Sequence, residues 1–297
     1  MPLPQYVVIT PVKNEAAHVE ATFRSMAAQT HRAFRWIIVD DGSTDGTAEA
    51  LEKLTASQGS WTRVIHRPPG GARRAGGAVI KAFNEGYQSA GTDGFDLVVK
   101  LDADLTFAPD YFERLCGEFQ RDPALGIASG VYRECRVPGQ WELVDMPRYH
   151  AAGCSKVLRL ECFKQIGGFI EERGWDTVDE IKAMSRGWKT CHFPKLVMDH
   201  HKPEGSAAGQ WRTGIMHGEI FYRCGGGLLF FFIKALERLK TPSAYGATCG
   251  LVWGFLRALF QRQALLVSRD EARTYRGLLK ARIRERLGFR TQLDANA

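Results

Sequence analysis

Residues 36–45 read WIIVDDGSTD, in which an apolar run ends in two acidic residues and a turn. The Val and Ile side chains predict a buried strand. The glycine and the small hydroxyl residues predict a turn in which Ser43 or Thr44 caps a helix. A helix cap does not account for the two preceding carboxylates, Asp40 and Asp41. We therefore expect these carboxylates to accept hydrogen bonds from a ligand, such as a base imide or a ribose hydroxyl.

The pattern of this stretch recurs on both sides of it. Four short runs rich in Val and Ile are predicted strands, at 6–10, 36–40, 62–66 and 97–102. The segments between them have helical length and are predicted helices, at 16–28, 44–57 and 76–90. Alternating strands and helices predict an α/β fold with a Rossmann-like, mostly parallel sheet flanked by helices.

Ligands of such sheets bind beyond the carboxyl ends of the strands. The residues at and after the end of the first predicted strand include Thr10, Pro11, Asn14 and Glu15. Asp102-Ala103-Asp104 follows the fourth strand, so its two carboxylates can turn toward one point outside the sheet. Hard oxygen ligands suit Mg²⁺ or Mn²⁺. We expect Asp102 and Asp104 to hold such an ion, with a helix cap or solvated loop as the alternative.

A glycine-rich basic segment precedes the third predicted helix. Residues 70–77 read GGARRAGG, where glycines permit close backbone approach and Arg73 and Arg74 can meet phosphate oxygens. A flexible basic loop is the alternative. The segment matches neither the G-x-G-x-x-G fingerprint nor the P-loop, which argues against a dinucleotide oxidoreductase and an ordinary ATPase.

Taken in order, these motifs resemble glycosyltransferase family 2, the inverting enzymes with a GT-A fold, over about residues 6–206. The resemblance implies transfer of a sugar from a UDP- or GDP-linked donor to an acceptor hydroxyl, by metal-dependent single displacement, in polysaccharide or glycolipid synthesis. It implies that Asp102-Ala103-Asp104 is the family's metal-binding D-x-D motif. The donor-binding residues that it implies are Thr10, Pro11, Asn14, Glu15, Asp40, Asp41, Arg73, Arg74, Asp102 and Ala103.

Beyond about residue 125 the alternation gives way to predicted short strands and a helix at 177–186. The sequence GWDTVDE that leads into this helix resembles the family's acceptor-side segment, without its usual Glu-Asp pair. Alignment on the following Gly-Trp places Asp176 at the family's catalytic base, and a gap of one residue would favour Asp179 or Glu180. An acidic first helical turn, stabilised by the helix dipole, is the alternative.

Two adjacent histidines, His200 and His201, follow this helix. Neighbouring residues of an extended segment point to opposite faces, so at most one is expected to reach the site. The resemblance implies that His200 or His201 contacts the metal. A pair satisfied at the surface or in the core is the alternative.

Charge and apolar residues are concentrated toward the end of the chain. Residues 257–290 carry ten Arg and Lys against three acidic residues, which equals the formal net charge of the whole chain, +7. The apolar runs at 228–233 and 250–256 fall short of the roughly 20 residues that span a bilayer. We expect this part to lie on an anionic membrane surface. The alternative is a set of core helices that pack against the catalytic domain or a partner.

The domain prediction follows from these patterns. Residues 1–209 are predicted to form the GT-A domain, with a nucleotide-binding half at about 1–123 and an acceptor half at about 124–209. Residues 210–297 are predicted to form a helical C-terminal region. Few aromatics interleave with its basic residues, so no nucleic-acid partner is expected. The expected partners are a nucleotide-sugar donor and a glycan or lipid-linked acceptor.

Seven cysteines without a C-x-x-C pair suit a reducing compartment, and the N-terminal sequence does not resemble a secretory signal. We expect a cytoplasmic protein, peripheral on the inner face of the cytoplasmic membrane. A sugar nucleotidyltransferase is an alternative, although it would carry a Gly-rich basic signature after the first strand. A non-catalytic nucleotide-sugar-binding protein is another, although both the D-x-D and the acceptor-side acids are retained.

Overall fold

The computed structural model describes residues 2–56, 59–68, 77–91, 93–137, 139–202, 209–238 and 245–286. The chain divides into two compact units, Met1–Pro203 and Glu204–Ala297. Each unit is described by itself.

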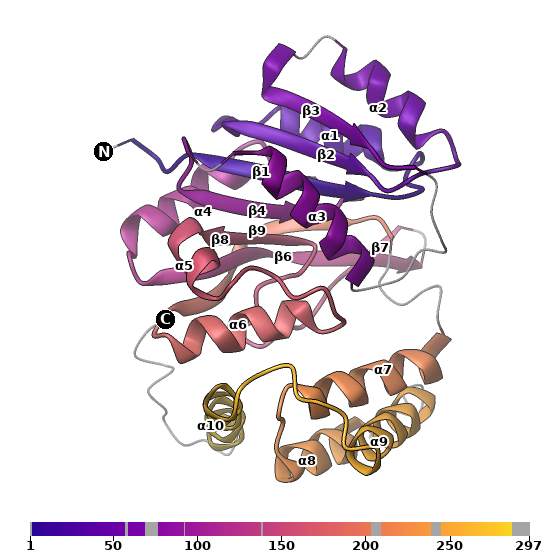
Figure 1. The fold of residues 1–297 in the computed structure, drawn as a ribbon. Coiled ribbons are helices and arrows are strands. Elements are labelled where there is room, and N and C mark those ends of the chain that lie inside the picture. The colour runs from indigo at the N-terminus through magenta and orange to yellow at the C-terminus, as the bar shows by residue number, and fades with distance from the viewer. Residues whose placement is uncertain are drawn as a thin grey trace. The chain divides into compact units, whose positions relative to one another are not determined.

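The first unit is built on one mixed sheet (Figure 1). Its strands are β1 (Tyr6–Val12), β2 (Arg35–Asp40), β3 (Thr62–His66), β4 (Leu97–Leu101), β5 (Leu105–Phe107), β6 (Leu125–Val137), β7 (Gln140–Leu143), β8 (Ser155–Arg159) and β9 (Lys189–His200). They lie in the order β3-β2-β1-β4-β8-β6-β9-β5, and β7 pairs with β6. Strands β1 to β4 are parallel to one another. Strand β8 lies between β4 and β6 and pairs antiparallel with both, and β6 pairs parallel with β9. The carboxyl ends of β1, β2 and β4 therefore meet at one edge.

Helices cover both faces of this sheet (Figure 1). They are α1 (Val19–Ala27), α2 (Thr47–Thr55), α3 (Gly77–Ser89), α4 (Tyr111–Arg121), α5 (Leu160–Gln165) and α6 (Trp175–Ser185), with a short 3-10 turn at Gly59–Trp61. Alternate residues of β1 belong to different cores. Tyr6 and Val8 pack with α1, α2 and α4, and Val7 and Ile9 pack with α3, α5 and α6. Both faces of the strand are buried, which accounts for its continuous apolar sequence.

The second helix begins later than predicted. It starts at Thr47, after Gly46 with φ of +91°, so neither Ser43 nor Thr44 caps it. Both residues instead bind the loop after β1, because Asn14 N donates to Ser43 Oγ at 2.9 Å and Thr44 N donates to Asn14 Oδ1 at 2.9 Å. The turn residues thus join two strand-end loops.

The predicted acceptor half, at about 124–209, contains two long strands where short ones were expected. β6 has 13 residues and β9 has 12, and a bulge divides their pairing. One step along β6, from Gly130 to Val131, corresponds to the step from Phe193 to Val197 in β9. A Cβ on Gly130 would lie 2.2 Å from Leu196 O, so the bulge requires glycine. The bulge interrupts the alternation that would have signalled a long strand.

The second unit contains four described helices: α7 (Gly209–Arg223), α8 (Leu228–Arg238), α9 (Tyr245–Phe260) and α10 (Arg269–Arg286). Helices α7 and α9 pack backbone to backbone through glycines. A Cβ on Gly218 would lie 2.1 Å from Leu251 O, and one on Gly254 would lie 2.1 Å from Ile215 O. Within the described helices, none combines the length and hydropathy needed to cross a bilayer.

Candidate active site

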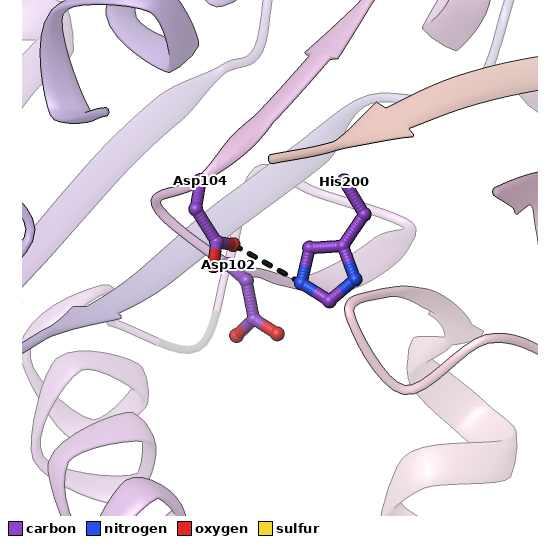
Figure 2. Close-up of side chains that lie close together, drawn as sticks. All are labelled: Asp102, Asp104 and His200. Carbon is purple, nitrogen blue, oxygen red and sulfur yellow. Dashed lines mark ion pairs between the residues drawn. The ribbon is translucent and has the colours of Figure 1, made fainter. Parts of the chain in front are cut away.

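An acidic and histidine cluster lies at the carboxyl edge of the sheet. Asp102 follows β4, Asp104 precedes β5, and His200 ends β9 (Figure 2). One potential ligand atom from each residue lies within 4.8 Å of the others. Antiparallel pairing of β5 with β9 sets Leu105 against His200, which brings the histidine beside Asp104. The pairing of β5 with β9 thus adds His200 to the two carboxylates of the D-x-D motif.

The cluster is suited to a cation. Asp104 is 6% exposed, and its Oδ1 accepts no hydrogen bond within the described part of the chain. Its nearest partner is His200 Nε2, at an ion-pair distance of 3.5 Å. A buried carboxylate oxygen without a hydrogen bond is costly. The three side chains are the oxygen and imidazole ligands that a divalent metal accepts.

The electrostatics of the two carboxylates differ. Burial raises the pKa of Asp102, against the charge of Lys100, and the neighbouring Asp104 raises it further. Burial also acts to raise the pKa of Asp104, but the close approach of His200 and its positive charge outweigh this and lower it. Two carboxylates in contact repel each other when both are ionised, and a bound cation would remove that repulsion.

Glu134 is a buried acidic residue beside this cluster that belongs to none of the sequence motifs. Glu134 in β6 is 2% exposed, and its Oε1 lies 3.7 Å from His200 Nδ1. It is the Cα partner of His200 in the β6–β9 pairing. A carboxylate on the far nitrogen of a ligating histidine orients the ring. No local pattern marks Glu134, because its place depends on register across the bulge.

The structure separates the two histidines. His201 Nε2 lies 2.9 Å from Thr106 Oγ1, and its ring stacks on His18. Its backbone meets the D-x-D segment, where His201 N donates to Asp104 O at 3.0 Å. Of the two candidates, His200 is the one whose ring lies with the carboxylates.

The predicted donor residues after β1 fall into two groups. Thr10 and Pro11 lie inside β1, and Thr10 Oγ1 accepts a hydrogen bond from Trp36 Nε1 at 2.9 Å. Asn14 is exposed and has a left-handed backbone, with φ of 56°. Glu15 is buried, and its Oε1 accepts a hydrogen bond from Lys202 Nζ at 2.9 Å. Lys202 thereby ties the segment after β9 to the loop after β1.

The two acids after β2 are held differently. Asp40 is buried, and it accepts a hydrogen bond from Ser43 N at 3.0 Å and contacts His66 Nδ1 at 3.2 Å. Asp41 is half-buried, and it pairs with Arg67 at 2.5 Å and with Lys13 at 3.8 Å. The predicted donor residues Arg73 and Arg74 lie outside the described residues.

The acidic residues of α6 are not equivalent. Lys156 in β8 is fully buried, and its Nζ lies 3.0 Å from Asp179 and 3.1 Å from Glu180. Glu180 also contacts His150 Nδ1 at 3.0 Å. Burial raises the pKa of Asp179 to about 7, against the charge of Lys156. Burial acts in the same direction on Glu180, but His150 and Lys156 outweigh it and lower the pKa.

Asp176 lies toward the D-x-D segment. A Cβ on Gly153 would lie 3.4 Å from Asp176 Oδ2, so the carboxylate packs on the backbone of Gly153. The next residue, Cys154, accepts a hydrogen bond through its carbonyl from Asp102 N at 2.8 Å. The segment at 153–154 thus contacts both Asp102 and Asp176.

A mixed sheet with a parallel N-terminal half and a D-x-D segment directly after β4 is an α/β fold of the GT-A type. Residues 7–175 match the family model described as Glycosyl transferase family 2, which covers more than half of the chain. The chain belongs to glycosyl transferase family 2 and is a glycosyltransferase.

Individual proteins that resemble this chain in sequence or in structure are also glycosyltransferases or proteins of polysaccharide synthesis. The chain is 26% identical over 285 residues to the succinoglycan biosynthesis protein ExoA of Rhizobium meliloti, covering 83% of this chain and 78% of the relative. It is 35% identical over 122 residues to an undecaprenyl-phosphate 4-deoxy-4-formamido-L-arabinose transferase of Pseudomonas aeruginosa, covering 38% of this chain and 32% of that protein. The mannosyltransferase PcManGT of Pyrobaculum calidifontis, solved with GDP-Man and Mn²⁺, shares the fold. Its TM-score is 0.60 at 18% identity, covering 96% of this chain and 81% of that one.

Proposed function

We propose that this glycosyltransferase moves a sugar from a UDP- or GDP-linked donor to an acceptor hydroxyl by metal-dependent single displacement with inversion. The acceptor is a glycan or a lipid-linked sugar in polysaccharide or glycolipid synthesis. The observation that carries the proposal is the cluster of Asp102, Asp104 and His200 with Asp176 on the adjoining segment. Residues 1–209 form the catalytic domain in this proposal.

The metal-binding residues are Asp102, Asp104 and His200, oriented by Glu134. A bound Mg²⁺ or Mn²⁺ supplies positive charge that stabilises the leaving diphosphate. Support comes from the buried Asp104 oxygen without a hydrogen bond and from the mixed oxygen and imidazole donor set.

Asp176 is the general base in this proposal. The acceptor oxygen forms a bond to the anomeric carbon, the bond from that carbon to the diphosphate oxygen breaks, and Asp176 takes the hydroxyl proton. Asp179 and Glu180 are poorly suited to this task, since Lys156 and His150 already engage them. They hold the helix that carries Asp176.

The donor nucleotide binds along the strand-end loops. Asp40 and Asp41 receive hydrogen bonds from the base or ribose, while the loop with Asn14 and Glu15 forms the adjoining wall. Arg73 and Arg74 are proposed to contact donor phosphates.

The second unit attaches the enzyme to the inner face of the cytoplasmic membrane in this proposal. Large apolar side chains are exposed along α8 and α9, namely Leu228, Leu229, Phe232, Leu236, Trp253, Leu259 and Phe260. Helix α10 adds exposed basic residues such as Arg269 and Lys280, which attract anionic head groups at about 1 kcal/mol each. A lipid-linked acceptor presents its hydroxyl at such a surface.

Incubation of the full chain with a panel of UDP- and GDP-sugars tests the reaction. We expect release of nucleoside diphosphate that requires Mg²⁺ or Mn²⁺ and is lost in Asp104→Ala. Release of pyrophosphate from a nucleoside triphosphate would indicate a nucleotidyltransferase instead. Binding of nucleotide sugars without turnover on any acceptor or water would favour the non-catalytic alternative. Full turnover in excess chelator would contradict the metal-dependent mechanism.

A further inference from the structure

A buried lysine lies within β4, which is otherwise apolar. Lys100 occurs in the sequence LVVKL, and its side chain is 4% exposed. A buried ammonium group is costly unless it is paired and hydrogen-bonded, so its partners indicate its role. Lys100 Nζ donates to Asp102 Oδ1 at 2.5 Å and to Gly153 O at 2.8 Å. Among the described residues, Asp102 is the one carboxylate at ion-pair distance from it.

The neighbouring strand carries a second buried lysine with its own acids. Lys156 in β8 is the Cα partner of Lys100 in the antiparallel register. Its charge is balanced by Asp179 and Glu180. Like charges at directly opposed positions destabilise a sheet. Lys100 therefore occupies an unfavourable position, and the carboxylate that it neutralises is Asp102.

This arrangement puts a fixed positive charge on a carboxylate of the proposed metal site. A divalent cation ligated by Asp102 is repelled by the ammonium group that contacts the same carboxylate. This repulsion is weakly screened, because the lysine is buried. A diphosphate brought to the cation adds negative charge that offsets the repulsion. The charges thus favour a cation that arrives with a diphosphate over a cation alone.

We propose that Lys100 is an internal counter-cation of the metal site, which weakens binding of a divalent cation alone and makes firm binding depend on a nucleoside diphosphate. This inference rests on the proposed function, because it assumes that Asp102 and Asp104 hold the metal. Linkage requires the reciprocal effect, so the cation raises the affinity for the diphosphate by the same factor. Lys100 is a positioning and charge-balancing residue here, and it touches no reacting atom.

Binding of Mn²⁺ to the full chain tests the inference, measured from the electron paramagnetic resonance signal of free Mn²⁺, with and without UDP or GDP. Lys100→Met removes the charge, and Lys100→Gln removes the charge but keeps a donor for the Gly153 carbonyl. We expect both variants to bind Mn²⁺ alone about tenfold more tightly than wild type, or more, which corresponds to about 1.4 kcal/mol. We expect the addition of UDP or GDP to raise the Mn²⁺ affinity of these two variants by a smaller factor than it raises that of wild type. Lys100→Arg keeps the charge and should bind Mn²⁺, with and without nucleotide, as wild type does.

Two controls separate failure of the inference from failure of the proposed function. Lys189→Gln removes a surface charge that pairs with Asp122, and it should leave Mn²⁺ affinity unchanged. Asp104→Ala should abolish nucleotide-assisted Mn²⁺ binding. If wild type shows no Mn²⁺ binding that depends on Asp104, the proposed metal site is wrong. If Asp104→Ala abolishes binding but the Met and Gln variants match wild type for Mn²⁺ alone, only the role of Lys100 is wrong. Melting temperatures confirm that each variant is folded.

Discussion

Three acidic side chains of α6 have different surroundings despite their closeness in sequence. Asp179 and Glu180 are buried against Lys156, whereas Asp176 packs on the backbone of Gly153 beside the D-x-D segment. The resemblance in sequence placed the base at Asp176, with Asp179 or Glu180 as the alternative if one residue is gapped. Their contacts now supply a physical basis for choosing Asp176.

We predict that Asp176→Asn lowers kcat by about 10²–10⁴-fold, because it removes the proton acceptor but keeps the size of the side chain. Its free energy of unfolding should stay within about 0.5 kcal/mol of wild type. Asp179→Asn should instead destabilise the fold by up to about 3 kcal/mol, because it leaves the buried Lys156 with one carboxylate fewer. Steady-state kinetics and urea denaturation on both variants measure the two effects. Normal kcat in Asp176→Asn would remove it from the mechanism.

His66 gives a pH-dependent prediction. A hydrogen bond to Glu52, opposed by burial, and a second to Asp40 raise the pKa of His66. Because the folded-state pKa is raised, protonated His66 stabilises the fold fully below the unfolded value of about 6.5, and this contribution disappears as pH rises through the raised pKa.

We therefore expect His66→Gln to cost more stability at pH 6 than at pH 9, as measured by urea denaturation at both values. The exposed position of His66 keeps the effect small. Glu52→Gln should reduce this pH dependence. An equal loss in free energy of unfolding at pH 6 and pH 9 would show that His66 stabilises the fold only through its neutral form.

The sequence reveals some site residues and conceals others for a physical reason. Asp102 and Asp104 follow an apolar run directly, so a local pattern marks them. Glu134 meets His200 only through strand pairing across a bulge, which no local pattern encodes. Lys100 has a local signal, a single charge inside an apolar strand, but that signal does not indicate which carboxylate the lysine contacts.

The packing of α7 against α9 depends on glycines at the contact. We predict that Gly254→Ala lowers the free energy of unfolding by about 1–3 kcal/mol, because the added Cβ would lie 2.1 Å from Ile215 O and force the helices apart. Gly277→Ala in α10 is the matched control. Nothing lies within 4 Å of its added Cβ, so it should raise stability by up to about 1 kcal/mol. Equal effects of the two changes would refute close backbone packing.

Elements were predictable where local sequence determines them. Strands β1 to β4 lie within two residues of their predicted bounds, because both faces are buried and the apolar runs are continuous. The long strands β6 and β9 were missed, because Gly130 and the residues of the bulge break their alternation. The start of α2 was misplaced, because Ser43 and Thr44 serve a neighbouring loop.

For the molecule as a whole, the exposed apolar side chains of the second unit give a test of membrane attachment. We predict that the full chain floats with liposomes that contain anionic lipid, and that high salt weakens this binding. A double variant, Phe232→Ser with Phe260→Ser, should bind at least about tenfold more weakly, because each side chain loses its favourable transfer from water. Phe34→Ser is the control, since Phe34 is also exposed but belongs to the first unit. Equal recovery of wild type and the double variant in the soluble fraction would contradict attachment.

The bulge between β6 and β9 has a consequence for how this enzyme can evolve. Pro194 and Lys195 are exposed at the bulge, and pairing resumes at Val197 with β6. His200 is fixed by this second stretch of pairing and by β5, independently of the residues before it. Insertions at 194–195 would therefore enlarge an outward loop while His200 keeps its place beside the carboxylates. We therefore expect that, among enzymes descended from this one, insertions at 194–195 would leave the position of His200 unchanged.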